Sequence, residues 1–153
     1  MAWATALSQN ACSASYCERT LPLLAARAQT LLALEADNAQ YKIYPNYSAA
    51  LRQSLQEAVD AVATVSTAEE KFQLVQKFSD LFREIRECKK AYIHLYEELF
   101  KISDIYADMQ TCGVITEAEY YAKMDELTPY SEGYENGSFS TEEAWNRSEE
   151  RRV

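Results

Sequence analysis

The sequence contains few of the residues that a turn-rich fold requires. Only three glycines and three prolines occur among its 153 residues. Tight turns need a positive or a fixed φ angle at defined positions, and these two residue types supply them. Their scarcity argues against a β-sandwich, a Rossmann unit and other folds with many short connections. Ala, Leu, Glu, Gln and Lys dominate instead, and these residues favour helix.

The sequence also lacks the elements on which most enzyme and metal sites depend. It has one histidine, His94, and its four cysteines form no Cys-x-x-Cys pair, whereas metal sites usually bring ligands in close pairs. No P-loop, Gly-x-Gly-x-x-Gly, His-Glu-x-x-His or Gly-x-Ser-x-Gly element is present. We therefore expect no enzyme activity, no cofactor and no metal. An enzymatic alternative rests on Asp104 and Asp108, which could share a helix face and hold a cation.

No apolar run approaches the roughly 18 residues that a membrane span needs. Residues 1–17 carry no charged side chain, and residues 8–10 (Ser-Gln-Asn) would interrupt the apolar core of a signal peptide. We therefore expect no membrane association and a cytoplasmic location, with an organelle interior as the alternative. In such a reducing compartment the cysteines, including Cys12 and Cys17, are expected to be free thiols.

The negative charge is concentrated in one part of the chain. The net charge is −9, yet residues 1–96 hold ten acidic and ten basic side chains, while residues 97–153 hold fourteen acidic and five basic ones. Nucleic acid is not an expected partner, because its binding usually depends on a basic surface. One basic cluster is interleaved with acids and is expected to be a solvated helix face, with a phosphate or acidic-partner site as the alternative. It consists of Arg83, Arg86, Lys89 and Lys90.

Apolar residues recur at helical spacing through most of the chain. Steps of four and three residues separate Leu51, Leu55, Ala58, Val62 and Val65. The pattern predicts an all-α fold, an antiparallel helical bundle of three main helices at about residues 20–40, 48–65 and 68–111. Short C-terminal helices are expected at about 117–127 and 141–150.

Capping and breaking residues set the expected ends of these helices. Capping boxes begin at Ser66, Thr67 and Thr116, and Gly113 is suited to a left-handed helix end. Pro22 is expected in the first turn of the first helix, where its missing N–H is tolerated, and Pro129 is expected to stop the fourth helix. The expected domains are a loosely ordered arm at residues 1–18, a helical bundle at 19–127, and an acidic flexible tail with one short helix at 128–153.

The helix expected at residues 68–111 has an apolar stripe that changes phase at Ile85 and widens beyond it. At 1.5 Å per residue it would be about 65 Å long, whereas the two preceding helices reach only about 30 Å. Its C-terminal half would expose an unusually large apolar patch, unless the C-terminal helix folds back on it or a second chain covers it. The expected interface residues are Tyr92, Leu95, Tyr96, Leu99, Phe100, Ile102, Tyr106, Met109, Ile115 and Tyr120.

These features favour a non-enzymatic helical module for protein–protein interaction or assembly. It would be a subunit of a homo- or hetero-oligomer that associates through the C-terminal half of the third helix. The alternative is an acidic inhibitor that mimics the charge of a nucleic acid against a basic protein. Salt distinguishes the two, because ionic contacts weaken steeply at high ionic strength and an apolar seam does not.

Residues 102–127 join an apolar helix end through Gly-Val-Ile-Thr-Glu-Ala-Glu-Tyr to a Lys-bearing helix that ends in Leu. The residues that carry this pattern are Gly113, Val114, Ile115, Thr116, Glu119, Tyr120, Lys123 and Leu127. The segment resembles the short C-terminal domain called SHOCT, in which a leucine-rich helix end leads through Gly-Ile-Ile/Leu-Thr-x-x-Glu-Phe/Tyr to such a helix. Met124 departs from it at a position that is often basic, and about 26 residues follow a motif that usually ends the chain. The resemblance implies a small helical appendage associated with oligomerisation.

Overall fold

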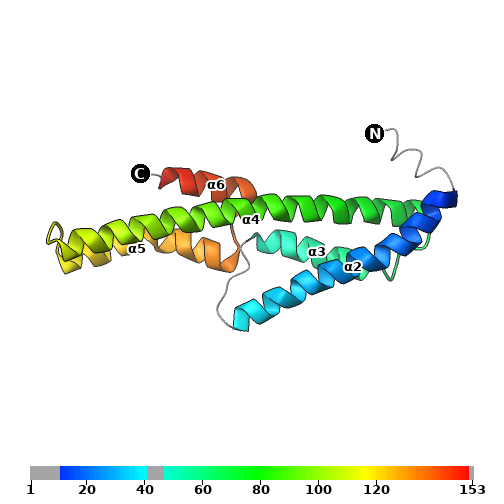
Figure 1. Ribbon diagram of the computed structural model, residues 1–153, viewed down its shortest axis with the longest axis horizontal. Helices are drawn as coiled ribbons and strands as arrows, with labels where there is room; N and C mark the ends of the chain where they lie inside the picture. The colour runs from blue at the N-terminus through cyan, green and yellow to red at the C-terminus, as the bar shows by residue number, and fades with distance from the viewer. Residues whose placement is uncertain (1–10, 41–46, 152–153) are drawn as a thin grey trace. The chain divides into compact units, whose positions relative to one another are not determined.

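A computed structural model of the chain describes residues 11–40 and 47–151, and within them it contains five helices and no strand. The helices are α2 (Ala11–Gln40), α3 (Ala49–Ala61), α4 (Ala68–Thr111), α5 (Glu117–Asn136) and α6 (Thr141–Glu150) (Figure 1). The all-α prediction is therefore confirmed. Residues 1–10 of the expected arm lie outside the described part. Within that part, none of the helices combines the length and the apolar character needed to cross a membrane.

The chain divides into two compact units, and the boundary falls inside α4 between Glu84 and Ile85. Unit 1 contains α2, residues 51–61 of α3 and residues 68–84 of α4. Unit 2 contains residues 47–50, residues 85–111 of α4, α5 and α6. This division differs from the expected arm, bundle and tail. It falls where the apolar stripe of α4 changes phase, so the two runs of that stripe serve two separate cores.

Unit 1 packs α2, most of α3 and the first part of α4 around one core. The carboxylate of Glu18 on α2 lies 3.3 Å from the Lys71 ammonium on α4, and the Arg27 guanidinium lies 4.4 Å above the Phe82 ring. The second contact lies further toward the C-terminus than the first on both helices, so α2 and α4 are parallel. The buried core consists of Cys17, Leu21, Ala25, Ala28, Leu55, Ala58, Leu74, Phe78, Leu81 and Phe82.

Helix α2 begins at Ala11, nine residues before the expected start at residue 20. Cys17, assigned to the arm from sequence, is buried in the seam of α2 four residues before Leu21. Burial raises the pKa of the Cys17 thiol, although nearby Lys71 opposes this shift. Pro22 lies in the helix interior rather than in its first turn, so the Glu18 carbonyl has no N–H partner at position 22.

The junction between α3 and α4 follows the predicted capping box at Thr67. The Glu70 carboxylate accepts hydrogen bonds from the N–H groups of Ser66 and Thr67 at 2.9 and 3.1 Å. The Glu70 N–H in turn donates to Thr67 Oγ1 at 3.1 Å. The hydrogen bonds from these two backbone N–H groups lower the pKa of the Glu70 carboxyl, and the bond from Ser66 has the larger effect.

In unit 2, α5 and α6 both pack on the C-terminal part of α4 (Figure 1). The buried apolar residues are Tyr47, Ile85, Cys88, Ala91, Tyr92, Leu95, Ile102, Leu127 and Ala144. Residues 47–50 close one side of this core: the Ser48 N–H donates to Cys88 Sγ at 3.3 Å, and the Ala49 N–H donates to the Gly137 carbonyl at 2.8 Å.

Helices α4 and α5 form an antiparallel hairpin that starts as the sequence predicts. Gly113 adopts a left-handed conformation with φ at 74°, and the Val114 N–H donates to the Met109 carbonyl at 2.8 Å, as in a Schellman ending. Thr116 then forms a complete capping box with Glu119 at the start of α5. Lys123 lies over the Tyr106 ring, which places the two helices side by side.

The expected end of the fourth helix is wrong. Helix α5 continues through Pro129 to Asn136, so residues 128–136 are helical instead of forming part of a flexible tail. Gly137 ends the helix with φ at 69°, and Ser140 then caps α6 with Glu143. The additional turns of α5 extend over α4 and create the pocket described below.

Candidate functional site

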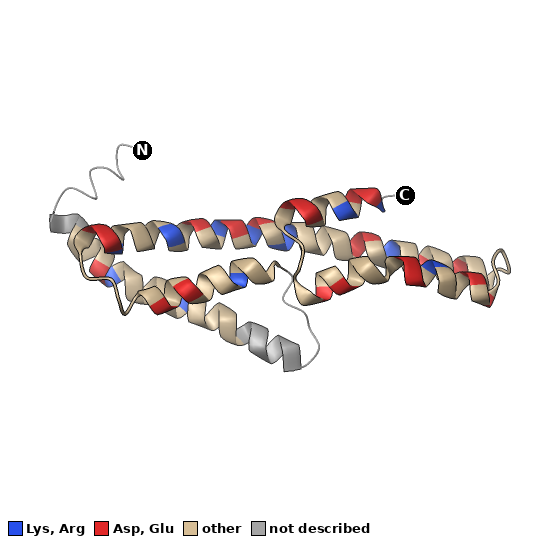
Figure 2. Cartoon of the chain, turned by 180° about the vertical axis from the view of Figure 1, so that it is seen from behind, with Lys and Arg blue, Asp and Glu red and all other residues tan. Residues whose placement is uncertain are grey.

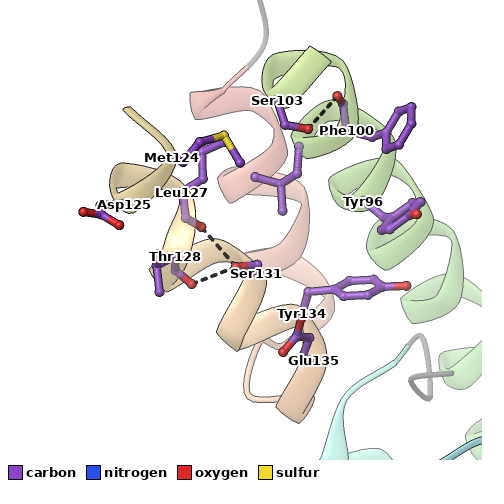
Figure 3. A pocket seen from close by; sticks show the side chains of 11 residues that line it. Tyr96, Phe100, Ser103, Met124, Asp125, Leu127, Thr128, Ser131, Tyr134 and Glu135 are labelled. Carbon is purple, nitrogen blue, oxygen red and sulfur yellow. Dashed lines mark hydrogen bonds between the residues drawn. The ribbon is translucent and has the colours of Figure 1, made fainter. Parts of the chain in front are cut away.

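A pocket of about 410 Å³ lies between α4 and α5, and all its lining residues belong to unit 2 (Figure 3). We call it the α4–α5 pocket. From α4 it is lined by Tyr96, Leu99, Phe100 and Ser103; from α5 it is lined by Met124, Asp125, Leu127, Thr128, Ser131, Tyr134 and Glu135. The pocket combines aromatic and aliphatic walls with a polar edge, which is the usual composition of a binding site.

The α4 wall presents two aromatic rings to solvent. Tyr96 and Phe100 are one helical turn apart, stack with ring centroids 6.3 Å apart, and remain 51% and 55% exposed. Ser103 Oγ donates to the Phe100 carbonyl at 2.9 Å, so this hydroxyl is held against its own helix. Because both rings stand on a continuous α-helix, the wall is present before any partner arrives.

The α5 wall carries a local break in the helical hydrogen-bond ladder. Pro129 has no N–H, so the Asp125 carbonyl four residues earlier cannot receive the usual bond from that position. Ser131 Oγ donates to the carbonyls of Thr128 at 3.1 Å and Leu127 at 3.4 Å. These contacts stabilise the helical turn that contains the proline. Asp125, Thr128 and Ser131 therefore place polar groups along one edge of the pocket.

Tyr134 reaches from α5 toward Tyr96 on α4 (Figure 3). Its ring centroid is 5.5 Å from that of Tyr96 and 5.8 Å from that of Tyr92. Burial raises the pKa of the Tyr134 phenol, and Tyr96 adds to the shift, so Tyr134 is neutral at physiological pH. Tyr92 is fully buried and donates its hydroxyl proton to the Phe139 carbonyl at 2.5 Å. Tyr134 therefore joins the pocket residue Tyr96 to the buried ring of Tyr92, which does not itself line the pocket.

The charged residues of the pocket are acidic. Asp125 and Glu135 are the only ionisable acids or bases besides tyrosine among its lining residues in the described part of the chain. Figure 2 shows Asp and Glu positions spread along α5. Unit 2 as a whole holds fifteen acidic and eight basic residues, against nine and seven in unit 1. The pocket therefore lies in the more negative of the two units.

The ten residues expected at an interface divide into three groups. Tyr92, Leu95 and Ile102 are buried inside unit 2, so the expectation that they need a second chain to cover them is wrong. Helices α5 and α6 cover this part of α4, which is the fold-back alternative raised from the sequence. Tyr96 and Phe100 remain exposed. The half-buried residues are Leu99, Tyr106, Met109, Ile115 and Tyr120.

Among those ten residues, three line the pocket: Tyr96, Leu99 and Phe100. The expected interface does not include the α5 wall, because Pro129 predicts an end to that helix whereas α5 continues through it. A signal for it was present in the sequence. Apolar and small residues continue through the proline with steps of four and three residues, in the order Tyr120, Met124, Leu127, Ser131 and Tyr134.

The other candidates from the sequence are not among the residues that line the pocket. Asp104 and Asp108 are exposed and do not line it. His94 is half-buried, with its ring centroid 5.1 Å from that of Trp145 and its Nε2 3.7 Å from a Glu149 oxygen. In the described residues, no group of three or more His, Cys, Asp or Glu side chains is placed to hold a metal ion.

The basic cluster of α4 makes mostly local contacts. Arg83 pairs with Asp80 at 2.8 Å and Lys90 pairs with Glu87 at 2.9 Å, each three residues away on the same helix. Lys89 lies 5.3 Å from the centroid of the buried Tyr47 ring. Such pairs are typical of a solvated helix face, and exposed pairs of this kind contribute little to stability.

No protein-family model, curated protein or solved structure was found to match this chain. The resemblance of residues 102–127 to the SHOCT domain stays a prediction. Its segment forms the end of α4, the Gly113 turn and the first half of α5. The function of the pocket is therefore argued from its geometry and chemistry.

Proposed function

We propose that this chain is a non-enzymatic protein-interaction module that serves as a subunit of a larger assembly. In this proposal the α4–α5 pocket receives apolar side chains of a partner protein. The observation that carries it is the pair Tyr96 and Phe100, two rings that are more than half exposed at the edge of a preformed pocket. Exposed aromatic residues beside a concave surface are typical anchors of protein interfaces.

The energy available at this pair is sufficient for a specific contact. Full burial of one aromatic side chain contributes about 1.5–3 kcal/mol, and aromatic contacts add about 0.5–1.5 kcal/mol when rings meet at favourable geometry. Ile93, three residues before Tyr96 on the same face of α4, is also exposed. Ile93, Tyr96 and Phe100 therefore form an apolar row over two turns of α4, next to the pocket.

The acidic-inhibitor alternative has weaker support from the contacts of the carboxylates. Glu119 and Glu143 are engaged in the capping boxes of α5 and α6. Glu150 accepts from Arg147 at 3.1 Å and from the Tyr130 hydroxyl at 3.1 Å. Carboxylates that are committed to caps and ion pairs within the chain are poor substitutes for a row of free phosphates.

The test is a double variant in the full-length chain, Tyr96→Asp with Phe100→Asp. A matched control is Leu23→Asp, which changes a 71% exposed apolar residue of unit 1. Light scattering over a wide concentration range measures self-association. Quantitative affinity capture from the source cells measures which proteins are retained by the wild type and the control but lost by the double variant.

Loss of self-association, or of one defined partner, in the double variant alone supports the proposal. Equal behaviour of all three proteins would contradict it, provided that circular dichroism shows the same helix content in each. The acidic-inhibitor alternative gives a different result. Its complex would survive the double variant and would dissociate between about 50 and 300 mM salt, because exposed charges are screened over this range.

A further inference from the structure

Two acidic ridges border the pocket and the apolar row of Ile93, Tyr96 and Phe100. On α5 the first ridge runs along the pocket edge through Asp125, Glu132 and Glu135, whose spacing of seven and three residues keeps them on one face. On α4 the second ridge consists of Glu97 and Asp104, which lie three residues before and four residues after Phe100. All five carboxylates are exposed.

Among the described residues, no basic side chain forms an ion pair with these carboxylates. The nearest basic side chains in sequence are committed elsewhere: Lys101 pairs with Glu98 at 2.9 Å, and Lys123 lies over the Tyr106 ring. The two ridges therefore present negative charge on both sides of the apolar row and the pocket.

The surface is elongated, which favours a helical occupant over a small molecule. The row from Ile93 to Phe100 covers eight residues of α4, and the seven steps between them span about 10 Å along the helix axis. Exposed Tyr121 precedes Asp125 by one turn on α5 and extends the apolar surface further. An amphipathic helix laid along such a strip would place residues i, i+3 or i+4 and i+7 against it.

We propose that the occupant of the α4–α5 pocket is a basic amphipathic helix of another protein. This inference rests on the proposed function and adds the chemistry of the partner. Its apolar stripe contacts Tyr96 and Phe100, and one of its larger side chains enters the pocket. Lysines and arginines on both sides of that stripe face the two ridges, which fixes orientation and speeds association.

The experiment selects helical peptides of about 16 residues from a display library on the immobilised full-length chain. The library varies the charged positions freely while keeping helix-forming residues elsewhere. Counter-selection uses the Tyr96→Asp, Phe100→Asp double variant, so that only peptides dependent on the pocket remain. We expect the enriched peptides to share an apolar stripe with flanking Lys or Arg.

Charge reversal then tests the ridges with one enriched peptide by fluorescence anisotropy. The double change Glu132→Lys, Glu135→Lys is expected to weaken binding about tenfold or more, because two complementary charges become repulsive. The matched control is Glu126→Lys on the same helix. Glu126 is exposed and does not line the pocket, so binding is expected to change by no more than about twofold.

The outcomes separate this inference from the function on which it rests. Enriched peptides that need Tyr96 and Phe100 but are neutral or acidic would overturn the basic partner and leave the interaction function intact. A concentration-dependent dimer that is lost in the double variant would identify a second copy as the occupant and would also overturn it. The absence of any peptide enriched over the double variant, together with unchanged self-association and capture, would count against both.

Discussion

The two units of this chain are both helical, but they differ in the side chains that they expose. Unit 1 buries short aliphatic residues and two phenylalanines, and the large apolar side chains it exposes among its described residues are Tyr16 and Leu23. Unit 2 has a buried core of its own but also exposes apolar and aromatic side chains. These are Ile93, Tyr96, Phe100, Ile105, Val114, Tyr121 and Trp145.

The difference is also electrostatic. The residues of unit 1 sum to a net charge of −2 and those of unit 2 to −7. A domain that only needs to fold does not require a surface that is both strongly charged and rich in exposed aromatic residues. Unit 2 therefore exposes more large apolar side chains and carries more net negative charge than unit 1, and a large exposed apolar surface is typical of an interaction site.

The first way to test this comparison is to truncate one phenylalanine in each unit. Phe78 in unit 1 is fully buried, so Phe78→Ala is expected to lower the free energy of unfolding by about 3–5 kcal/mol. Phe100→Ala in unit 2 is expected to cost about 1 kcal/mol or less, because the ring is largely exposed. Urea unfolding followed by circular dichroism measures both. A similar loss in the two variants would show that Phe100 is part of a core.

The second test concerns the two left-handed glycines of unit 2. A Cβ atom on Gly113 would meet nothing within 4 Å, whereas one on Gly137 would lie 2.9 Å from the Ala49 nitrogen and 3.0 Å from the Tyr47 carbonyl oxygen. Gly113→Ala is expected to cost about 1 kcal/mol from backbone strain alone. Gly137→Ala is expected to cost about 3 kcal/mol, because overpacking against residues 47–49 is added. Equal losses of unfolding free energy would show that the close packing of Gly137 against residues 47–49 does not stabilise unit 2.

The third test uses the proline inside one helix of each unit. Pro22 and Pro129 are both exposed and both lie in helix interiors. A proline is about 3 kcal/mol less favourable than alanine there, and part of this is offset because proline also stiffens the unfolded chain. Pro22→Ala and Pro129→Ala are therefore each expected to raise the unfolding free energy by about 2 kcal/mol. A decrease would mean that the local helix geometry at that proline is needed for packing.

The same two prolines show how far the sequence could predict the structure. Apolar periodicity and capping residues predicted α3, α4, the Thr67 box, the Gly113 turn and the Thr116 box. Pro22 and Pro129 misled the prediction, because local propensity assigns proline to helix ends while the apolar seams continue past both positions. Tertiary packing of Cys17 and Leu127 outweighs the lost hydrogen bonds.

The candidate site was less predictable than the fold. Tyr96 and Phe100 could be placed on an exposed face of α4 from their spacing. The opposite wall could not, because it depends on where α5 ends and on which residues of α4 that helix covers. Tyr92, Leu95 and Ile102 share the stripe of α4 with Leu99, and periodicity alone does not distinguish residues buried by the chain itself from residues left for a partner.

The fourth test concerns Tyr92, the buried phenol of unit 2 whose ring contacts the pocket residue Tyr134. Tyr92→Phe removes the hydrogen bond to the Phe139 carbonyl and is expected to cost about 1 kcal/mol at neutral pH. Burial raises the pKa of Tyr92 well above its ordinary value in the folded protein, whereas in the unfolded chain it titrates near its ordinary value of about 10.

Because the unfolded chain loses this proton first, wild-type stability is complete below about pH 10 and falls as the pH rises through that value toward the higher folded pKa. Tyr92→Phe lacks this loss, so urea unfolding measured from about pH 8 to pH 11 should show the two stabilities converging. Tyr121→Phe is the control, since Tyr121 is 58% exposed and should leave both the stability and its slope unchanged. Parallel curves for wild type and Tyr92→Phe would mean that this phenol ionises as readily in unit 2 as in water, which would contradict its burial beside Tyr134.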